Sequence, residues 1–279
     1  MTRRSLVRPI MPGDLTAVRE ILDADPIGQC FVASRVHRAG ADPWRLGGDL
    51  LGYFPDDELT SMVFVGANLV PVSTSESARA AFADRLRGTR RCSSILGPAG
   101  EVLDLWRLLE VSWGPAREVR ARQDLLMLDE PPLIDADTRV RPATIDELEL
   151  LMPACVAMFI EEVGVSPLAG GNAGGYRARV AELIREQRAL VLIEEDRVIF
   201  KAEIGVVGPA ACQVQGVWVA PEFRGRGLSA PAMAAVVEHA RRAFTSTVSL
   251  YVNDFNTPAR KAYQRIGMHS IGTFATVLL

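Results

Sequence analysis

The spacing of apolar positions in the second half of the chain predicts a definite order of elements. Short apolar runs predict strands over residues 189–195, 198–207, 211–220 and 247–252. Apolar positions three or four residues apart predict helices over 145–160, 176–188, 227–243 and 256–266. A short strand near 138–142 opens this series, and a terminal strand pair closes it. Short turns between the central strands favour antiparallel pairing, so we expect an α+β fold around a mostly antiparallel sheet.

The first half of the chain contains the same pattern. The segment "LVRPIMPGDLTAVREIL" corresponds to "RVRPATIDELELLMP", and each predicts a short strand followed by an amphipathic helix. A second pair, "DDELTSMVFVGA" and "EDRVIFKAEIGV", predicts an acidic turn and an apolar strand that ends at Gly66 and Gly205. Two matches in the same order favour duplication over chance similarity. We therefore expect two domains, residues 1–130 and 138–279, joined by the Pro-rich and acidic segment 129–137.

Composition limits the class of protein. The chain has 279 residues, of which 48% are hydrophobic and 23% charged, as in an ordinary globular protein. Its net charge of −3 gives no indication of a nucleic-acid surface, so we expect no nucleic-acid partner. No apolar run is long enough to span a bilayer, so we expect a cytoplasmic protein with no membrane partner. The four cysteines lie far apart without metal-ligand spacing, which favours free thiols and no metal site.

The segment "VWVAPEFRGRGLS" contains the clearest chemical signal. A predicted strand turns directly into a predicted helix here, and the free amides at a helix start attract anions. Gly225 and Gly227 let the backbone approach such an anion closely, while Arg224 and Arg226 add charge suited to phosphate. Ser229 adds a hydroxyl in the first turn. Taken alone, the tetrapeptide Arg-Gly-Arg-Gly at residues 224–227 is equally consistent with an ordinary surface turn.

Two motifs make the second half similar to the GNAT superfamily of acyl-CoA-dependent N-acyltransferases. Arg224, Gly227 and Ser229 match the family's motif A, Q/R-x-x-G-x-G/A, with Ser in the last position. The segment "LYVNDFNTPARKAYQRIGM" resembles motif B, with Asn256 and Tyr263 at the familiar spacing. The whole chain resembles tandem GNAT proteins of the actinobacterial type, an architecture shared by mycothiol synthase. The resemblance implies two GNAT folds, each a mostly antiparallel mixed sheet flanked by helices.

The resemblance also implies a binding mode for acetyl-CoA, the expected co-substrate. Strand 211–220 would part from strand 247–252, and the pantetheine arm would pair with the backbone around Val217, Trp218 and Val219. The diphosphate would lie on the amides of the motif A segment, and Asn256 would contact the pantetheine arm. The cofactor-binding residues of motif A would be Arg224, Gly225, Arg226, Gly227, Leu228 and Ser229.

Two residues are candidates for the chemistry of acyl transfer. Tyr263 matches the motif B tyrosine that protonates the leaving thiolate, although its spacing from Ile266 also fits a core aromatic. Glu203 lies among apolar residues of a predicted strand and would act as the general base if it faces the acceptor. If Glu203 instead pairs with Lys201, two residues away on the same strand face, it is a strand charge. Glu161 and Glu162 either attract a cationic amine or are solvated at a helix end.

The first half lacks both motifs. No Arg-Gly-x-Gly follows Gly66, and "SSILGPAGEVLDLWRLL" carries no equivalent of Asn256. We therefore expect a degenerate GNAT-like domain with a structural role. For the whole chain, we expect an N-acetyltransferase that moves an acetyl group from acetyl-CoA to a primary amine by direct attack. The alternative is a catalytically silent acyl-CoA-binding sensor or interaction module. The sequence determines neither the amine acceptor nor the oligomeric state.

Overall fold

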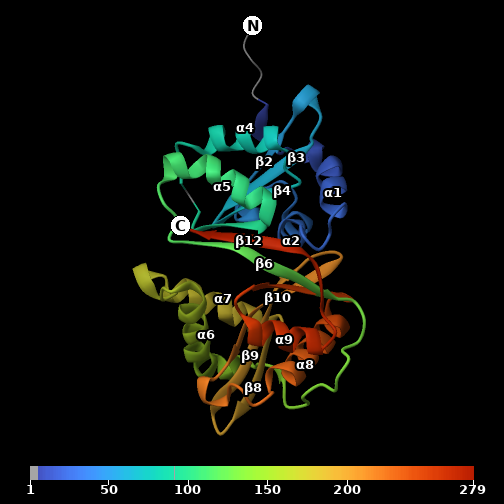
Figure 1. The fold of residues 1–279 in the computed structure, drawn as a ribbon, viewed down its shortest axis with the longest axis vertical. Coiled ribbons are helices and arrows are strands. Elements are labelled where there is room, and N and C mark those ends of the chain that lie inside the picture. Colours follow the sequence, from blue (N-terminus) through green and yellow to red (C-terminus); the bar gives the residue numbers. More distant parts are fainter. Residues whose placement is uncertain (1–5, 91) are drawn as a thin grey trace.

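The computed structural model describes residues 6–90 and 92–279, so residues 1–5 and 91 of the predicted N-terminal domain lie outside it. Its strands form one twelve-stranded sheet in the order β1-β2-β3-β4-β5-β12-β6-β11-β10-β9-β8-β7. Helices cover the sheet on both faces, with the N-terminal half at the top and the C-terminal half at the bottom of Figure 1. The expected α+β class, with a large mixed sheet flanked by helices, is confirmed.

Two similar series of elements follow one another along the chain. The first series is β1 (Val7–Pro9), α1 (Leu15–Asp23), α2 (Cys30–Ala39), α3 (Pro43–Leu46), β2 (Gly48–Tyr53), β3 (Ser61–Gly66), β4 (Asn68–Val72), α4 (Glu76–Leu86), β5 (Ser94–Pro98), α5 (Ala99–Trp113) and β6 (Glu118–Leu128). The second is β7 (Arg141–Pro142), α6 (Leu148–Val163), α7 (Ala173–Arg185), β8 (Ala189–Glu194), β9 (Arg197–Val207), β10 (Ala211–Val219), α8 (Ser229–Ala243), β11 (Thr247–Asn253), α9 (Thr257–Arg265) and β12 (His269–Leu278). Each series has one parallel strand pair, β4–β5 and β10–β11. The repeated order confirms the tandem architecture.

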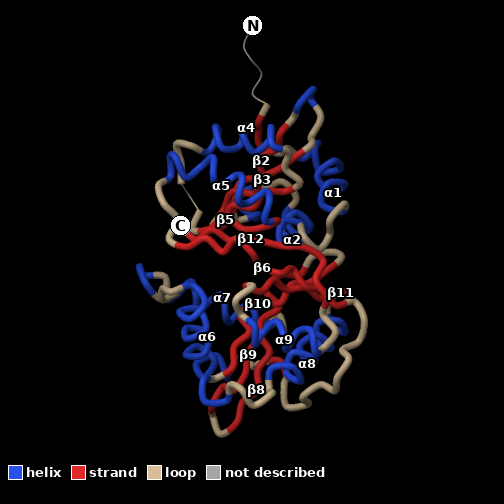
Figure 2. Tube along the Cα trace, in the orientation of Figure 1, coloured by secondary structure: helices blue, strands red, loops and turns tan. Residues whose placement is uncertain are grey.

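The last strands of the two series are exchanged between the halves. β6 belongs to the first series but pairs antiparallel with β11 of the second, from Val248↔Leu128 to Asn253↔Gln123. β12 belongs to the second series but pairs with β5, from Phe274↔Pro98 to Leu278↔Ser94. β6 and β12 also pair with each other and cross the middle of the molecule side by side (Figures 1 and 2). Each half therefore completes its sheet with a strand of the other, and the division at residues 130–138 stays a prediction.

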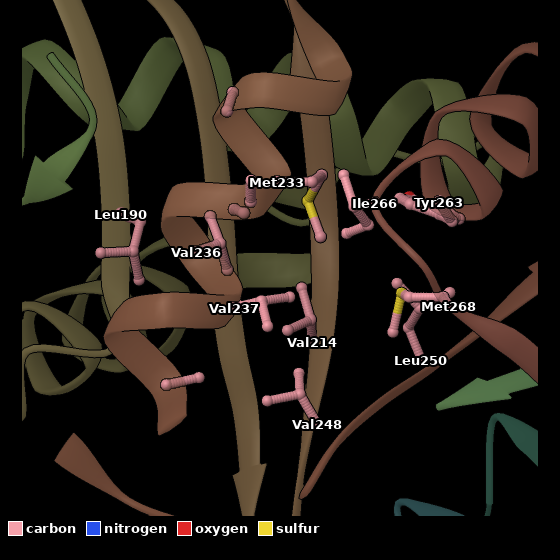
Figure 3. Close-up of a cluster of buried hydrophobic side chains, with 14 of the residues drawn as sticks. Leu190, Val214, Met233, Val236, Val237, Val248, Leu250, Tyr263, Ile266 and Met268 are labelled. Atoms are coloured by element: carbon pink, nitrogen blue, oxygen red, sulfur yellow. The ribbon is translucent and has the colours of Figure 1, made fainter. Parts of the chain in front are cut away.

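Buried apolar side chains hold the helices against both faces of the sheet. In the second half, α8 and α9 pack on β9, β10 and β11, where Met233, Val237, Val214 and Leu250 share one cluster (Figure 3). α6 and α7 cover the opposite face of β8 and β9 through a separate cluster. Side chains alternate along a strand, so every second residue of β9 faces α6 rather than α8. The candidate chemistry of β9 lies on this α6 face.

The elements of the second half agree with the predicted ones except at the end of the chain. The sequence predicts a terminal strand pair, whereas the structure has one long strand, β12, whose partners β5 and β6 come from the first half. The Gly-rich segment after α6 is also shorter than predicted, because α7 begins at Ala173. The four cysteines are free and buried. Within the described ranges, no helix is long and apolar enough to cross a membrane.

Candidate active site

The parallel strands β10 and β11 part halfway along their length. They pair only over Ala211↔Thr247, Cys212↔Val248 and Gln213↔Ser249. Beyond Gln213 the edge of β10 that faces β11 has no strand partner in the described chain, and this edge includes Val217, Trp218 and Val219. An unpaired strand edge offers backbone donors and acceptors to an extended ligand. The expected separation of these two strands is present.

A β-bulge bends β10 at the same place. Gln215 pairs with Glu203 and Trp218 pairs with Lys201, so two residues of β10 lie opposite one residue of β9. Gly216 in the bulge has a φ of 58°, a conformation that favours glycine. A Cβ atom at Gly216 would lie 3.2 Å from Lys201 Nζ and 3.3 Å from Glu203 Cδ. The bulge thus brings the β10 backbone directly over these two charged side chains.

The segment from Gly225 to the first turn of α8 presents a row of free amides. Gly225 and Gly227 have φ angles of 73° and 75°, and an added Cβ at either would meet no atom within 4 Å. The N-cap residue of α8, Leu228, has no side chain that can accept a hydrogen bond from the helix start. Among the described residues, no acceptor bonds to the amides of residues 225–230. We call residues 224–229 the cradle; its open amides and the helix dipole would favour an anion.

The arginines of the cradle lie at its edge. Arg224 donates to the carbonyl of Val219 at 2.9 Å and to Glu161 Oε2 at 2.7 Å. Glu161, at the end of α6, also accepts from the indole of Trp218 at 3.1 Å. Arg226 is exposed, with its guanidinium carbon 5.0 Å from the centre of the Phe223 ring. The carboxylate of Glu161 therefore ties α6 to the bulged strand and to the cradle, which neither interpretation of Glu161 anticipated.

Tyr263 lies on the inner side of α9, where its ring packs beside Ile266 in the cluster of Figure 3. The residue is only 6% exposed, and burial, reinforced by the charge of Glu162, raises the pKa of its phenol above the ordinary value. Its hydroxyl makes no hydrogen bond to a described residue, and the hydroxyl oxygen is not fully buried. The hydroxyl therefore reaches the surface of the cluster while the ring belongs to the core. The core packing of Tyr263 is present, and its role as the acid stays a prediction.

Glu203 is buried on the α6 face of β9 and forms an ion pair. Lys201 Nζ lies 2.5 Å from Glu203 Oε1, and the two residues are 1% and 7% exposed. The side-chain amide of Gln215 lies 3.5 Å from Glu203 Oε2, and the thiol of Cys155 lies 4.0 Å from Oε1. Burial lowers the pKa of Lys201, but the charge of Glu203 outweighs this and raises it. The pairing with Lys201 that the sequence left open is present.

Cys155 and Asn256 have clear structural roles. Burial raises the pKa of the Cys155 thiol to about 11, so the thiol is protonated at neutral pH and is no nucleophile. Asn256 is the N-cap of α9, and its Oδ1 accepts from the amide of Ala259 at 3.3 Å. This bond uses the oxygen of the exposed side chain and leaves its NH₂ group without a partner in the described chain. Ser229 is half-buried at the start of α8.

The first half of the chain contributes a side chain near these residues. Arg120 of β6 bonds to Glu118 at 2.9 Å and to Glu162 Oε1 at 2.5 Å, and it also donates to the backbone carbonyl of Glu162. Its side chain is only 10% exposed. A cation at the last carbonyls of a helix complements the helix dipole, so Arg120 caps the end of α6. Glu162 in turn lies near Tyr251 and Tyr263, since its charge raises the pKa of both phenols after burial.

Comparison with known proteins agrees with this geometry. Residues 170–268 match the model of the acetyltransferase (GNAT) family. The chain carries a GNAT domain. Residues 48–151 match the model of a domain of unknown function, DUF4081, and no curated protein matches the chain. GNAT proteins use acetyl-CoA, so the GNAT domain supports acyl transfer.

Several solved structures share the fold over the whole chain. A GNAT-family acetyltransferase from Colwellia psychrerythraea has 12% identity and a TM-score of 0.57, over 98% of this chain and 99% of that chain. A GCN5-related N-acetyltransferase from Sphaerobacter thermophilus has 17% identity and a TM-score of 0.59, over 97% and 94%. A tandem GNAT protein from the clavulanic acid biosynthesis pathway has 15% identity and a TM-score of 0.53, over 97% of each chain. At these identities the similarity concerns the fold, which is that of tandem GNAT proteins.

Motifs A and B follow the parted strands β10 and β11, and the structure adds Cys155 and Arg120 to the pairing of Lys201 with Glu203 that the sequence had left open. Lys201 and Cys155 surround Glu203, and Arg120 joins β6 to α6. The two-residue spacing of Lys201 and Glu203 had already indicated that these side chains share a strand face and can pair. No local pattern could reveal Arg120, because its partner Glu162 is 42 residues away.

Proposed function

We propose that the protein is an N-acetyltransferase that transfers an acetyl group from acetyl-CoA to a primary amine. The observation that carries this proposal is the cradle, with its consecutive open amides beside the unpaired edge of β10. A diphosphate needs closely spaced donors and positive charge, and the cradle offers both. The pantetheine arm needs an extended partner, and the edge around Val217 and Val219 offers one. Asn256 would contribute its free side-chain NH₂ group.

The reaction would proceed by direct attack. The neutral amine nitrogen forms a bond to the thioester carbonyl carbon, and the bond from carbon to sulfur breaks. The departing thiolate of CoA takes the proton of the Tyr263 hydroxyl, and the phenolate regains a proton from solvent. Burial keeps Tyr263 protonated throughout the neutral pH range, so the acid is available whenever the thiolate leaves. The attacking nitrogen becomes positively charged when its bond to carbon forms, and it then loses one proton to a base.

Glu203 is our candidate for that base. It lies under the bulge of β10, and its Oε2 faces the side chain of Gln215 rather than Lys201. Lys201 holds the other oxygen, so one carboxylate oxygen can accept a proton from the amine through a water molecule. The buried ion pair would fix the direction of this oxygen. Lys201 would act as a positioning residue.

Arg120 would extend the site into the first half of the chain. By holding Glu162 and the end of α6, it would set the position of the segment that begins at Gly164 and covers the acceptor side. Changing Arg120 to Gln should therefore raise the KM of the amine and lower kcat about tenfold, with the Kd of acetyl-CoA unchanged. A Kd for acetyl-CoA that rises in parallel would contradict this role. Arg122→Gln, on the same strand, is the matched control.

Calorimetric titration with acetyl-CoA and an assay of CoA release with a panel of amines test the proposed function. Suitable amines are spermidine, kanamycin and a peptide with a free N-terminus. We expect one acetyl-CoA per chain and release of CoA with at least one amine. If acetyl-CoA does not bind, the cradle is not a diphosphate site and the proposal is wrong.

A second candidate is a silent acyl-CoA-binding module. The ion pair between Lys201 and Glu203 favours it, because pairing with a lysine makes a carboxylate a weaker base. Gln213 and Gln215 add no carboxylate on the neighbouring strand. Tight binding of acetyl-CoA without CoA release across the panel would support this candidate. CoA release that depends on Tyr263 would exclude it.

A further inference from the structure

A cavity of about 500 Å³ lies between α9 and the two exchanged strands. Its walls come from Arg122, Asp124 and Leu126 of β6, from Arg260 and Gln264 of α9, and from the residues that lead into β12. The volume is within the range of small-molecule sites. Because β6 comes from the first half of the chain and α9 from the second, a ligand here would contact both halves.

The cavity is separate from the proposed acetyl-CoA site. Arg260 and Gln264 are four residues apart and lie on one side of α9. Tyr263, the buried residue of the same helix, does not line the cavity. The cavity also borders β6, which lies beyond β11 from the parted edge of β10. No cradle residue lines it.

The charged groups around the cavity are not balanced. Asp124 is its only acidic lining residue, and it already pairs with Arg260 at 2.8 Å. Arg122 is exposed, and its guanidinium makes no hydrogen bond or ion pair to the described part of the chain. His269, also in the lining, is exposed in the same way. The cavity therefore carries at least one uncompensated positive charge.

The guanidinium of Arg260 is held in a fixed orientation. One Nη donates to the carbonyl of Asp254 at 3.2 Å, and the other pairs with Asp124. Its Nε is fully buried and has no partner in the described chain, although a buried polar group without a partner destabilises a protein. Fixed guanidinium groups bind carboxylate and phosphate oxygens better than mobile ones do.

The floor of the cavity is apolar. Leu126 and Met268 line it and are 4% and 3% exposed. Met268 belongs to the same cluster as Leu250, beside which it lies in Figure 3. An anion that also carries a short hydrocarbon chain could cover this floor while its oxygens meet Arg122 and Arg260. Both parts of such a ligand would then gain contacts.

We propose that this cavity binds a small organic anion, a carboxylate or phosphate ester with a short apolar chain, and that the bound anion joins the two halves of the protein. The proposal does not depend on acetyl transfer. It also predicts that the ligand raises the melting temperature, because it binds the folded state across the exchanged strands.

Hexanoate, hexyl phosphate and inorganic phosphate are suitable probes, with hexylammonium as the opposite charge on the same chain. We expect hexanoate or hexyl phosphate to bind in calorimetry and to raise the melting temperature. The tighter of the two identifies the headgroup. Equal binding by hexylammonium, or no binding by any anion, would overturn the proposal. Equal affinity for inorganic phosphate would show that the apolar floor is not used and would overturn that part.

Variants locate the probe. Arg122→Ala removes an exposed guanidinium that has no partner in the described chain, so it should leave the fold intact and weaken binding at least tenfold. Arg265→Ala removes an equal charge from the outer side of α9 and should change nothing. If the two variants weaken binding equally, the affinity depends only on the net charge of the protein and the proposal is wrong. Displacement of the probe by CoA, or its loss in Gly227→Val, would place it in the cradle and likewise overturn the proposal.

Discussion

The start of α4 and the start of α8 occupy the same position in the two halves, but only one of them is open. In both halves a parallel strand pair parts, and the chain turns from the strand into a helix. At α4 the hydroxyl of Ser75 accepts from the amide of Ala78 at 3.1 Å. At α8 the corresponding N-cap is Leu228, which cannot accept a hydrogen bond through its side chain. The same helix geometry is therefore closed in one half and available in the other.

An internal anion fills the place in the first half that acetyl-CoA would occupy in the second. Glu101, in the first turn of α5, accepts from the amide of Thr74 at 2.7 Å and from its hydroxyl at 2.5 Å. Arg79 donates to the carbonyl of Thr74 and pairs with Asp104. Pro71, on the parting strand β4, offers no N–H to an extended ligand. Protein groups thus occupy the start of α4 in the first half.

If acetyl-CoA binds the cradle as we propose, the duplicated fold alone does not make such a site. The features that distinguish the start of α8 are the two glycines with positive φ and an N-cap residue, Leu228, whose side chain cannot accept a hydrogen bond. The following changes test this difference, beginning with the largest expected effect.

Replacing Gly227 by Val should abolish acetyl-CoA binding. The φ of 75° disfavours a β-branched residue, and the added side chain would occupy the space above the open amides. We expect the Kd in calorimetry to rise at least about 100-fold. Gly114→Val is the matched control, because Gly114 has a φ of 78° at the end of α5 in the first half. An equal loss of affinity in this control would attribute the effect to backbone strain.

Replacing Tyr263 by Phe should lower kcat about 100-fold, since general acid catalysis contributes at least this factor. The ring would still fill the core, so the Kd of acetyl-CoA and the melting temperature should change little. Steady-state kinetics and calorimetry on the same preparation separate these quantities. Tyr53→Phe, in the core of the first half, should leave kcat unchanged. Full activity of Tyr263→Phe would exclude the acid role.

Replacing Glu101 by Gln should destabilise the protein without creating a second acetyl-CoA site. The amide and hydroxyl of Thr74 would lose a charged acceptor, which costs about 1–3 kcal/mol of unfolding free energy. Urea denaturation measures this loss, and calorimetry should still give one acetyl-CoA per chain. A second bound acetyl-CoA would show that Glu101 alone had closed the first half.

High pH should destabilise the contact between the halves. Cys30 of α2 donates to the carbonyl of Ala211 in β10 at 3.1 Å, and burial raises the pKa of its thiol to about 12. In the unfolded chain this thiol loses its proton from about pH 8.5 upward. The folded state therefore binds more protons in this range, and stability is full below it and falls as pH rises toward 12.

The contribution of Cys30 can be measured directly. Cys30→Ala should reduce the pH dependence of the unfolding free energy by up to about 1.4 kcal/mol per pH unit above pH 9. Urea denaturation from pH 7 to pH 10.5 gives this slope, and the value at pH 7 gives the separate packing cost. An unchanged slope would contradict the assigned pKa.

Local rules predicted much of this molecule. The pattern of apolar residues predicted the helices and strands of the second half. Gly225 and Gly227, singled out in the sequence because they lack a Cβ, both have a left-handed φ. The pairing of Lys201 with Glu203 was one of two alternatives, because residues two apart share a strand face.

The partners of β6 could not be predicted in this way. The sequence "EVRARQDLLML" is consistent with a strand, but nothing in it selects β11 over β5 as a neighbour. The selection depends on side chains distant in sequence, such as Gln123, which bonds to Asn253 at 3.0 Å and accepts from Thr276 at 2.7 Å. Arg120 reaches Glu162 only because of this choice.

The exchange of β6 and β12 has a consequence for how the protein is made. β5 lies in the first hundred residues, but its second neighbour in the sheet is β12, residues 269–278. While the ribosome is still adding the second half, the edge of β5 is uncovered, and uncovered strand edges are sites of aggregation. A nascent chain that stops before residue 269 would leave both halves incomplete, so neither half can mature as an independent unit during translation.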